Sequence, residues 1–80
     1  MKPVQPNELT DSVKKTLSAY LAQLGDQPAT DIYNMVTRHV EKAMLEWVLE
    51  ETAGNQTKAA GMLGISRNTL RRKLEQYRIQ

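Results

Sequence analysis

The chain has 80 residues, a formal net charge of +2 and no cysteine. A chain this short buries a small share of its surface, so its core is marginal unless disulfides, a metal or a partner subunit add stability. The absence of cysteine excludes disulfides and thiolate metal sites, and a single histidine, His39, is too little for a metal cage. We therefore expect no metal or other cofactor, and oligomerisation is the expected source of stability.

The charge is unevenly distributed along the chain. Residues 1–54 carry five basic and eight acidic side chains, whereas residues 55–80 carry six basic side chains and one acidic one. Positive charge gathered in one region is typical of a protein that binds a polyanion, although a solvated helix face explains it equally well at this point. No segment resembles a signal peptide or approaches the roughly 18 apolar residues of a membrane span, which predicts a cytoplasmic protein without membrane contact.

A first helix is predicted from about residue 8, after a disordered tail at residues 1–7 that contains two prolines. Asn7 or Thr10 is its expected N-cap, and Gly25-Asp26-Gln27-Pro28 ends it. Its apolar residues recur at helical spacing: Leu9, Val13, Leu17, Leu21 and Leu24, with Tyr20 on the same flank.

A second and longest helix is predicted from Asp31 to Thr52, with Thr30 as its N-cap. Its apolar stripe is wider than one short neighbour can bury. Either the other helices of the chain cover the whole stripe, or part of it meets a second subunit, and we favour the second interpretation. The candidate dimer interface consists of Ile32, Met35, Val36, Val40, Ala43, Met44, Trp47 and Val48, with Leu45 and Leu49 widening the stripe.

Two short helices are predicted in the last third of the chain. Gly54 ends the long helix, and Asn55 caps a helix over Gln56–Leu63. A turn at Gly64-Ile65-Ser66 follows, and Ser66 caps a last helix from Arg67 to about Tyr77. The sequence thus predicts an all-α chain of four helices with a helical dimerisation region at residues 8–54.

The spacing of small and apolar residues indicates that residues 55–80 form a helix-turn-helix. Ala60 is small where two helices pass closely, and Gly64 suits a left-handed turn position. Leu63, Ile65, Leu70, Leu74 and Tyr77 are expected to pack between the helices. A generic amphipathic hairpin needs neither Ala60 nor Gly64 at this spacing.

Polar side chains at the starts of both short helices predict a DNA-binding site. A recognition helix brings its N-terminal residues to base edges, where arginine pairs with guanine and asparagine with adenine. Further basic residues and a helix N-terminus suit phosphates. The candidates are Asn55, Gln56, Thr57, Lys58, Ser66, Arg67, Asn68, Thr69, Arg71, Arg72 and Lys73. No constellation of catalytic residues is present, so we expect no enzymatic activity.

The segments Gly54–Ala60 (GNQTKAA) and Gly64–Leu74 (GISRNTLRRKL) resemble the factor for inversion stimulation (Fis) family of bacterial nucleoid-associated proteins and transcription regulators. The resemblance extends upstream through Asp11–Lys14 and Ala22–Leu24. The C-terminal domains of enhancer-dependent bacterial activators share similar segments. Because Met1 stands just before the first helix, we expect a free-standing Fis-like protein without the N-terminal hairpin arm of longer members.

The resemblance implies an intertwined homodimer that bends double-stranded DNA in the nucleoid and tolerates many site sequences. It also implies that Arg67 contacts guanine and that Thr69 and Arg72 approach base edges. Asn55, Thr57, Arg71 and Lys73 would hold the DNA backbone. Some family members contact RNA polymerase through a basic turn position, where this chain has Ala53. Two alternatives remain, a helical protein-interaction adaptor and a site-specific regulator that does not bend DNA.

Overall fold

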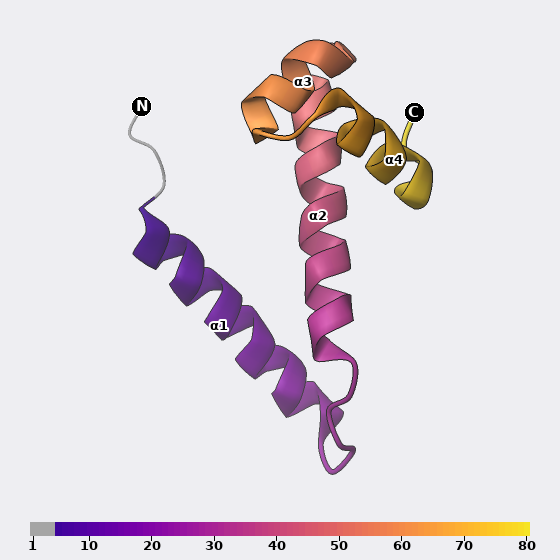
Figure 1. Ribbon diagram of the computed structural model, residues 1–80. Helices are drawn as coiled ribbons and strands as arrows, with labels where there is room; N and C mark the ends of the chain where they lie inside the picture. The colour runs from indigo at the N-terminus through magenta and orange to yellow at the C-terminus, as the bar shows by residue number, and fades with distance from the viewer. Residues whose placement is uncertain (1–4) are drawn as a thin grey trace. The chain divides into compact units, whose positions relative to one another are not determined.

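The computed structural model describes residues 5–80. Its elements in chain order are α1 (Pro6–Leu24), α2 (Ile32–Glu51), α3 (Gln56–Leu63) and α4 (Arg67–Tyr77) (Figure 1). The predicted all-α architecture of four helices is confirmed. The chain divides into two compact units, residues 1–32 and residues 33–80. Within residues 5–80, no helix has both the length and the apolar character needed to cross a membrane.

Helix α1 begins earlier than the sequence indicated. Gln5 is its N-cap, with φ −71° and ψ 143°, and Pro6 is its first residue. Proline suits this position because it lacks the N–H that would go unsatisfied there and its φ is already helical. The expectation of a tail through residue 7, with Asn7 or Thr10 as the cap, was therefore wrong for Pro6 and Asn7. The remainder of that tail, residues 1–4, lies outside the described residues.

Helix α2 ends in a turn that places a non-glycine residue in the left-handed region. Ala53 has φ 52° and donates its N–H to the carbonyl of Glu50, while the Gly54 N–H donates to the carbonyl of Leu49 at 2.8 Å. These two bonds form a Schellman motif. The sequence predicted that Gly54 would end the helix, but Ala53 occupies the strained position and Gly54, with φ 81°, follows it.

The core of the unit at residues 33–80 lies where α3 and α4 pack on the C-terminal half of α2 (Figure 1). Its buried apolar side chains are Leu45, Val48, Leu49, Ala59, Ala60, Leu70 and Leu74, with Leu63, Ile65, Tyr77 and Ile79 packed against them. Val48 is fully buried in this core, so its expected place in the dimer interface was wrong: α3 and α4 cover it within the chain.

The broad apolar stripe of α2 divides into two adjacent faces, one buried and one exposed. The face with Leu45, Val48 and Leu49 is buried in the core. A second face carries Val40 and Trp47, one heptad apart, and is exposed: the exposed fractions are 46% for Val40 and 52% for Trp47. Burying only the first face leaves α2 with a large apolar surface.

Candidate DNA-binding interface

The turn between α3 and α4 fixes the angle at which the two helices meet. Gly64 is left-handed, with φ 75° and ψ 30°. Its N–H donates to the carbonyls of Ala60 and Gly61, and the Ile65 N–H donates to the carbonyl of Ala60 at 3.1 Å. This is a Schellman motif whose following residue, Ile65, packs against the core. The predicted roles of Ala60 and Gly64 are confirmed, since Ala60 is 4% exposed and Gly64 takes the left-handed position.

The N-termini of α3 and α4 are capped by the residues that the sequence indicated. The Asn55 side-chain oxygen accepts a hydrogen bond from the Lys58 N–H at 3.1 Å. The Ser66 hydroxyl oxygen accepts from the Thr69 N–H at 3.0 Å and donates to the Thr69 hydroxyl at 2.9 Å. Both helices therefore begin at defined residues, which holds their remaining N–H groups at fixed places.

A hydrogen bond joins the beginnings of the two helices. The Arg67 guanidinium donates from Nη1 to the Thr57 hydroxyl at 3.2 Å. One turn further along α4, Arg71 Nη2 donates to Asn68 Oδ1 at 3.0 Å. Each arginine is thus held by a neutral polar partner, which orients the guanidinium and leaves its charge uncompensated.

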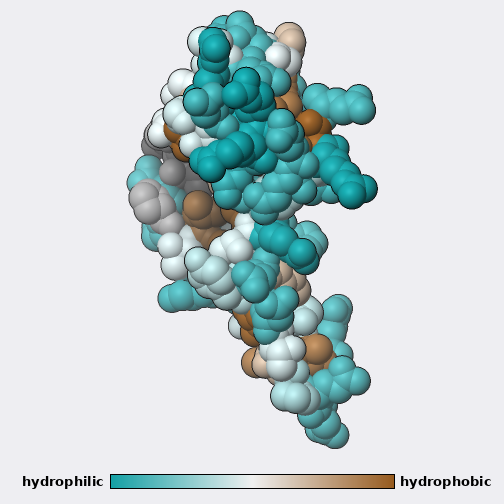
Figure 2. Space-filling model, turned by 45° about the vertical axis from the view of Figure 1, so that its right-hand side comes forward, coloured by the Kyte–Doolittle hydropathy of each residue, from teal (hydrophilic) through white to brown (hydrophobic). Residues whose placement is uncertain are grey.

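Most candidate side chains lie exposed around this junction. The exposed candidates are Asn55, Gln56, Thr57, Lys58, Ser66, Arg67, Asn68, Arg71 and Arg72, while Thr69 is partly buried. In Figure 2, which brings the α4 side of the molecule forward, hydrophilic side chains cover most of the region around α4. The apolar side of α4, with Leu70 and Leu74, is buried in the core. The helix therefore presents a basic, polar face to the outside.

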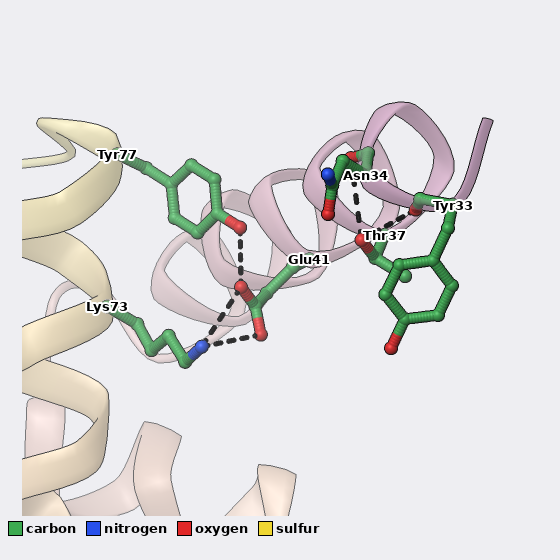
Figure 3. Close-up of polar contacts among 6 residues, drawn as sticks. All are labelled: Tyr33, Asn34, Thr37, Glu41, Lys73 and Tyr77. Atoms are coloured by element: carbon green, nitrogen blue, oxygen red, sulfur yellow. Dashed lines mark hydrogen bonds and ion pairs between the residues drawn. The ribbon is translucent and has the colours of Figure 1, made fainter. Parts of the chain in front are cut away.

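Lys73 differs from the other candidates because a carboxylate of α2 binds it. Its ammonium lies 3.2 Å from Oε2 and 3.3 Å from Oε1 of Glu41, and Tyr77 donates its hydroxyl proton to Oε1 (Figure 3). The side chains of Lys73 and Glu41 are 36% and 32% exposed. Glu41 could not be found from the sequence, because it lies 32 residues before its partner and belongs to no local motif.

The hydrogen bonds of this cluster shift the pKa values of Glu41 and Tyr77 in opposite directions. The Tyr77 hydroxyl, and next to it the Lys73 ammonium, lower the pKa of Glu41 from its ordinary 4.5, against an opposing effect of burial. The Tyr77 hydroxyl donates its proton to this carboxylate, so the protonated form of Tyr77 is favoured. The hydrogen bond to Glu41 therefore raises the pKa of Tyr77 from 10.0. Glu41 is therefore ionised and Tyr77 neutral across the neutral range.

Together, the capped helices, the Schellman turn and the polar outer face of α4 define a helix-turn-helix DNA-binding protein. The family model of the bacterial regulatory proteins of the Fis family matches residues 37–77. A Pseudomonas aeruginosa protein described as Fis-like and DNA-binding is 53% identical over 76 residues, covering 94% of this chain and 73% of that protein. DNA-binding protein Fis of Haemophilus influenzae is 51% identical over 74 residues, covering 92% of this chain and 75% of the relative.

DNA-binding protein Fis of Aliivibrio fischeri is 51% identical over 69 residues, covering 86% of this chain and 70% of the relative. The chain belongs to the Fis family. It is accordingly a DNA-binding protein and not an enzyme, as the sequence predicted.

Proposed function

We propose that the chain acts as a homodimer that bends DNA, as a nucleoid-associated protein and transcription regulator of the bacterial cytoplasm. The observation that carries the proposal is the outer face of α4, where Arg67 is exposed at the first helical position and aligned by Thr57. A helix N-terminus of this kind enters the major groove with its first residues toward the bases.

We assign base contacts to the first two turns of α4. Arg67 has the paired donors that match O6 and N7 of guanine, and Asn68 has the amide that matches adenine. Thr69 and Arg72 approach base edges or the phosphates beside them. Because few side chains read bases directly, we expect a tolerant sequence preference in which the deformability of DNA contributes to site choice.

We assign phosphate contacts to the start of α3 and the middle of α4. The α3 N-terminus presents backbone N–H groups beside the exposed side chains of Gln56, Thr57 and Lys58. Asn55 caps this terminus, and Arg71 and Lys73 extend the basic surface along α4. Such contacts give affinity with little dependence on sequence.

The exposed apolar face of α2 supports the dimer. The side chains of Val40, Met44 and Trp47 are 46%, 47% and 52% exposed, and Ala43 lies on the same face. Ile32, Met35 and Val36 are partly buried earlier on α2. Leu9 and Leu21 on α1 are 62% and 56% exposed. An 80-residue chain gains most from covering these residues with a second copy, so we place the dimer interface at residues 8–54, without Val48.

The proposed bending depends on the geometry of the proposed dimer. One helix, α2, carries both the exposed apolar face and the core that holds α4, so the interface fixes the distance between the two recognition helices. If that distance is shorter than one DNA turn of about 34 Å, both helices enter adjacent major grooves only when the duplex bends.

At the exposed α2–α3 turn, Ala53 offers RNA polymerase no basic side chain, so we assign regulation to DNA occupancy.

A salt titration and a circular-permutation gel test this proposal together. The logarithm of the DNA affinity should fall steeply with the logarithm of the salt concentration, by about 0.9 for each phosphate contacted. When a site selected from random DNA is moved along a fragment, the mobility of the complex should pass through a minimum near the centre. A flat salt response would contradict the phosphate contacts, and equal mobility at every position would favour a regulator that does not bend DNA.

A further inference from the structure

The carboxylate of Glu41 lies where the DNA-binding face of α4 meets α2. Both of its oxygens face the Lys73 ammonium, at 3.2 Å and 3.3 Å, and Tyr77 holds one of them from the next turn of the same helix (Figure 3). A carboxylate held in this way presents two anionic oxygens to a lysine, as a DNA phosphate does. Lys73 is therefore already bound to an anion before DNA arrives.

The other cations of α4 lack this arrangement. Arg67 and Arg71 are hydrogen-bonded to neutral oxygens of Thr57 and Asn68. Their charges remain available to DNA, whereas the charge of Lys73 is balanced within the chain. To contact a phosphate, Lys73 must either break its ion pair with Glu41 or bring the Glu41 carboxylate close to the phosphate, which repels it. Either route reduces the binding free energy that Lys73 contributes.

From these contacts we infer that Glu41 is an internal competitor of DNA phosphate for Lys73 and lowers the affinity of the α4 face for the DNA backbone. The inference rests on the proposed function, in which α4 faces DNA. It makes Glu41 a positioning residue that acts through Lys73, with Tyr77 fixing the carboxylate. Such an ion pair limits the affinity for the DNA backbone, which helps a protein that binds many DNA sites to dissociate from them.

The test compares Glu41→Gln, Lys73→Met, the double variant and the wild type on a mixed-sequence duplex at several salt concentrations. Glutamine keeps an oxygen for the Tyr77 hydroxyl while losing the charge, and methionine keeps much of the lysine stem. Glu75→Gln is the matched control, because Glu75 is exposed on α4 and, among residues 5–80, takes part in no ion pair. Thermal melting of each variant reports on its fold.

We expect Glu41→Gln to bind DNA about two- to fivefold more tightly than the wild type, in the range of an exposed ion pair. Its salt slope should steepen by about 0.9 for each Lys73 released. Lys73→Met should bind DNA more weakly than the wild type, because it loses a phosphate contact and leaves the Glu41 carboxylate without its cation. Adding Glu41→Gln should therefore raise the affinity less in the Lys73→Met background than in the wild type, because no lysine is released. Glu75→Gln should gain less than Glu41→Gln.

Three results would overturn the inference: an unchanged slope in Glu41→Gln, a gain from Glu41→Gln that is as large in the Lys73→Met background as in the wild type, or a gain no larger than that of Glu75→Gln. Weaker binding by a Glu41→Gln protein that melts like the wild type would overturn it too, because Glu41 would then help DNA binding. A loss of DNA binding in every protein, including the wild type, would instead reject the proposed function.

Discussion

Arg67, the first residue of α4, donates a hydrogen bond to the hydroxyl of Thr57, in the first turn of α3. The bond joins a side chain assigned to bases with one assigned to phosphates. A hydroxyl that accepts from Arg67 still has a proton to donate, so Thr57 can bridge the guanidinium and a phosphate oxygen. The two helices thereby present their polar groups to DNA as one unit.

Thr57→Val keeps the shape of the side chain and removes this bridge. We expect weaker binding to a selected site, and a smaller effect of the same change when Arg67 is already alanine. Coupled residues show interaction energies of about 0.5–3 kcal/mol in such double-mutant cycles. Binding measured by fluorescence anisotropy gives the coupling energy, and strictly additive effects would show that Thr57 acts independently of Arg67.

Ala53 and Gly64 occupy equivalent left-handed positions, with φ 52° and φ 75°, but only one of them is glycine. Ala53→Gly should raise the free energy of unfolding by about 0.5–1 kcal/mol, because glycine removes the steric cost of the conformation. Gly64→Ala should lower it by about 1 kcal/mol, since an added Cβ meets nothing within 4 Å and the cost is confined to the backbone. Urea denaturation of both variants checks the opposite signs, and changes of the same sign would contradict the assignment.

The hydrogen bond between Tyr77 and Glu41 predicts a pH window of added stability. The pKa of Glu41 is lowered from 4.5 on folding, so its contribution is present above that value and is lost as the pH falls through the folded pKa. The pKa of Tyr77 is raised from 10.0, so its contribution is present below that value and is lost as the pH rises through the folded pKa.

Tyr77→Phe should therefore be less stable than the wild type between about pH 5 and pH 10, and the difference should shrink on both sides of this window. Both residues are only partly buried, so screening by water keeps the effect on the free energy of unfolding small. Melting curves taken across the pH range provide the measurement. A difference between the two proteins that does not change with pH would show that the lost contacts are packing alone.

Val40→Asp tests the proposed dimer on the exposed face of α2. A carboxylate at the centre of an apolar interface is left unpaired and should dissociate the subunits, so that the mass measured by sedimentation equilibrium falls from twice 9.1 kDa toward 9.1 kDa. Lys42→Asp, on the far side of the same helix, is the control and should leave the mass unchanged. A Val40→Asp protein that remained dimeric would place the interface elsewhere.

Local sequence rules were sufficient for the helix-turn-helix. The bounds of α3 and α4, the caps Asn55 and Ser66, and the left-handed Gly64 follow from short-range chemistry that residues 55–77 contain in full. Ala53 escaped prediction because the neighbouring glycine is the better left-handed residue, and only the fold shows which of the two takes the position.

Contacts between distant residues could not be predicted in the same way. Helical spacing places Val48 on the apolar side of α2 but does not say whether α3 and α4 or another subunit cover it. The ion pair of Glu41 with Lys73 depends on the angle between α2 and α4, which no local pattern encodes. The DNA-contacting residues and the dimer therefore remain predictions for experiment.

The most direct test of the central claim is the affinity of Arg67 variants for a duplex selected from random DNA by the wild-type protein. Arg67→Ala should lose about ten- to a hundredfold of the specific affinity while keeping its fold and oligomeric state. Arg67→Lys should keep the binding to mixed-sequence DNA but lose the preference for the selected site, because lysine keeps the charge without the paired donors. An Arg67→Ala protein that bound the selected site as tightly as the wild type would contradict the account of α4 as the recognition helix.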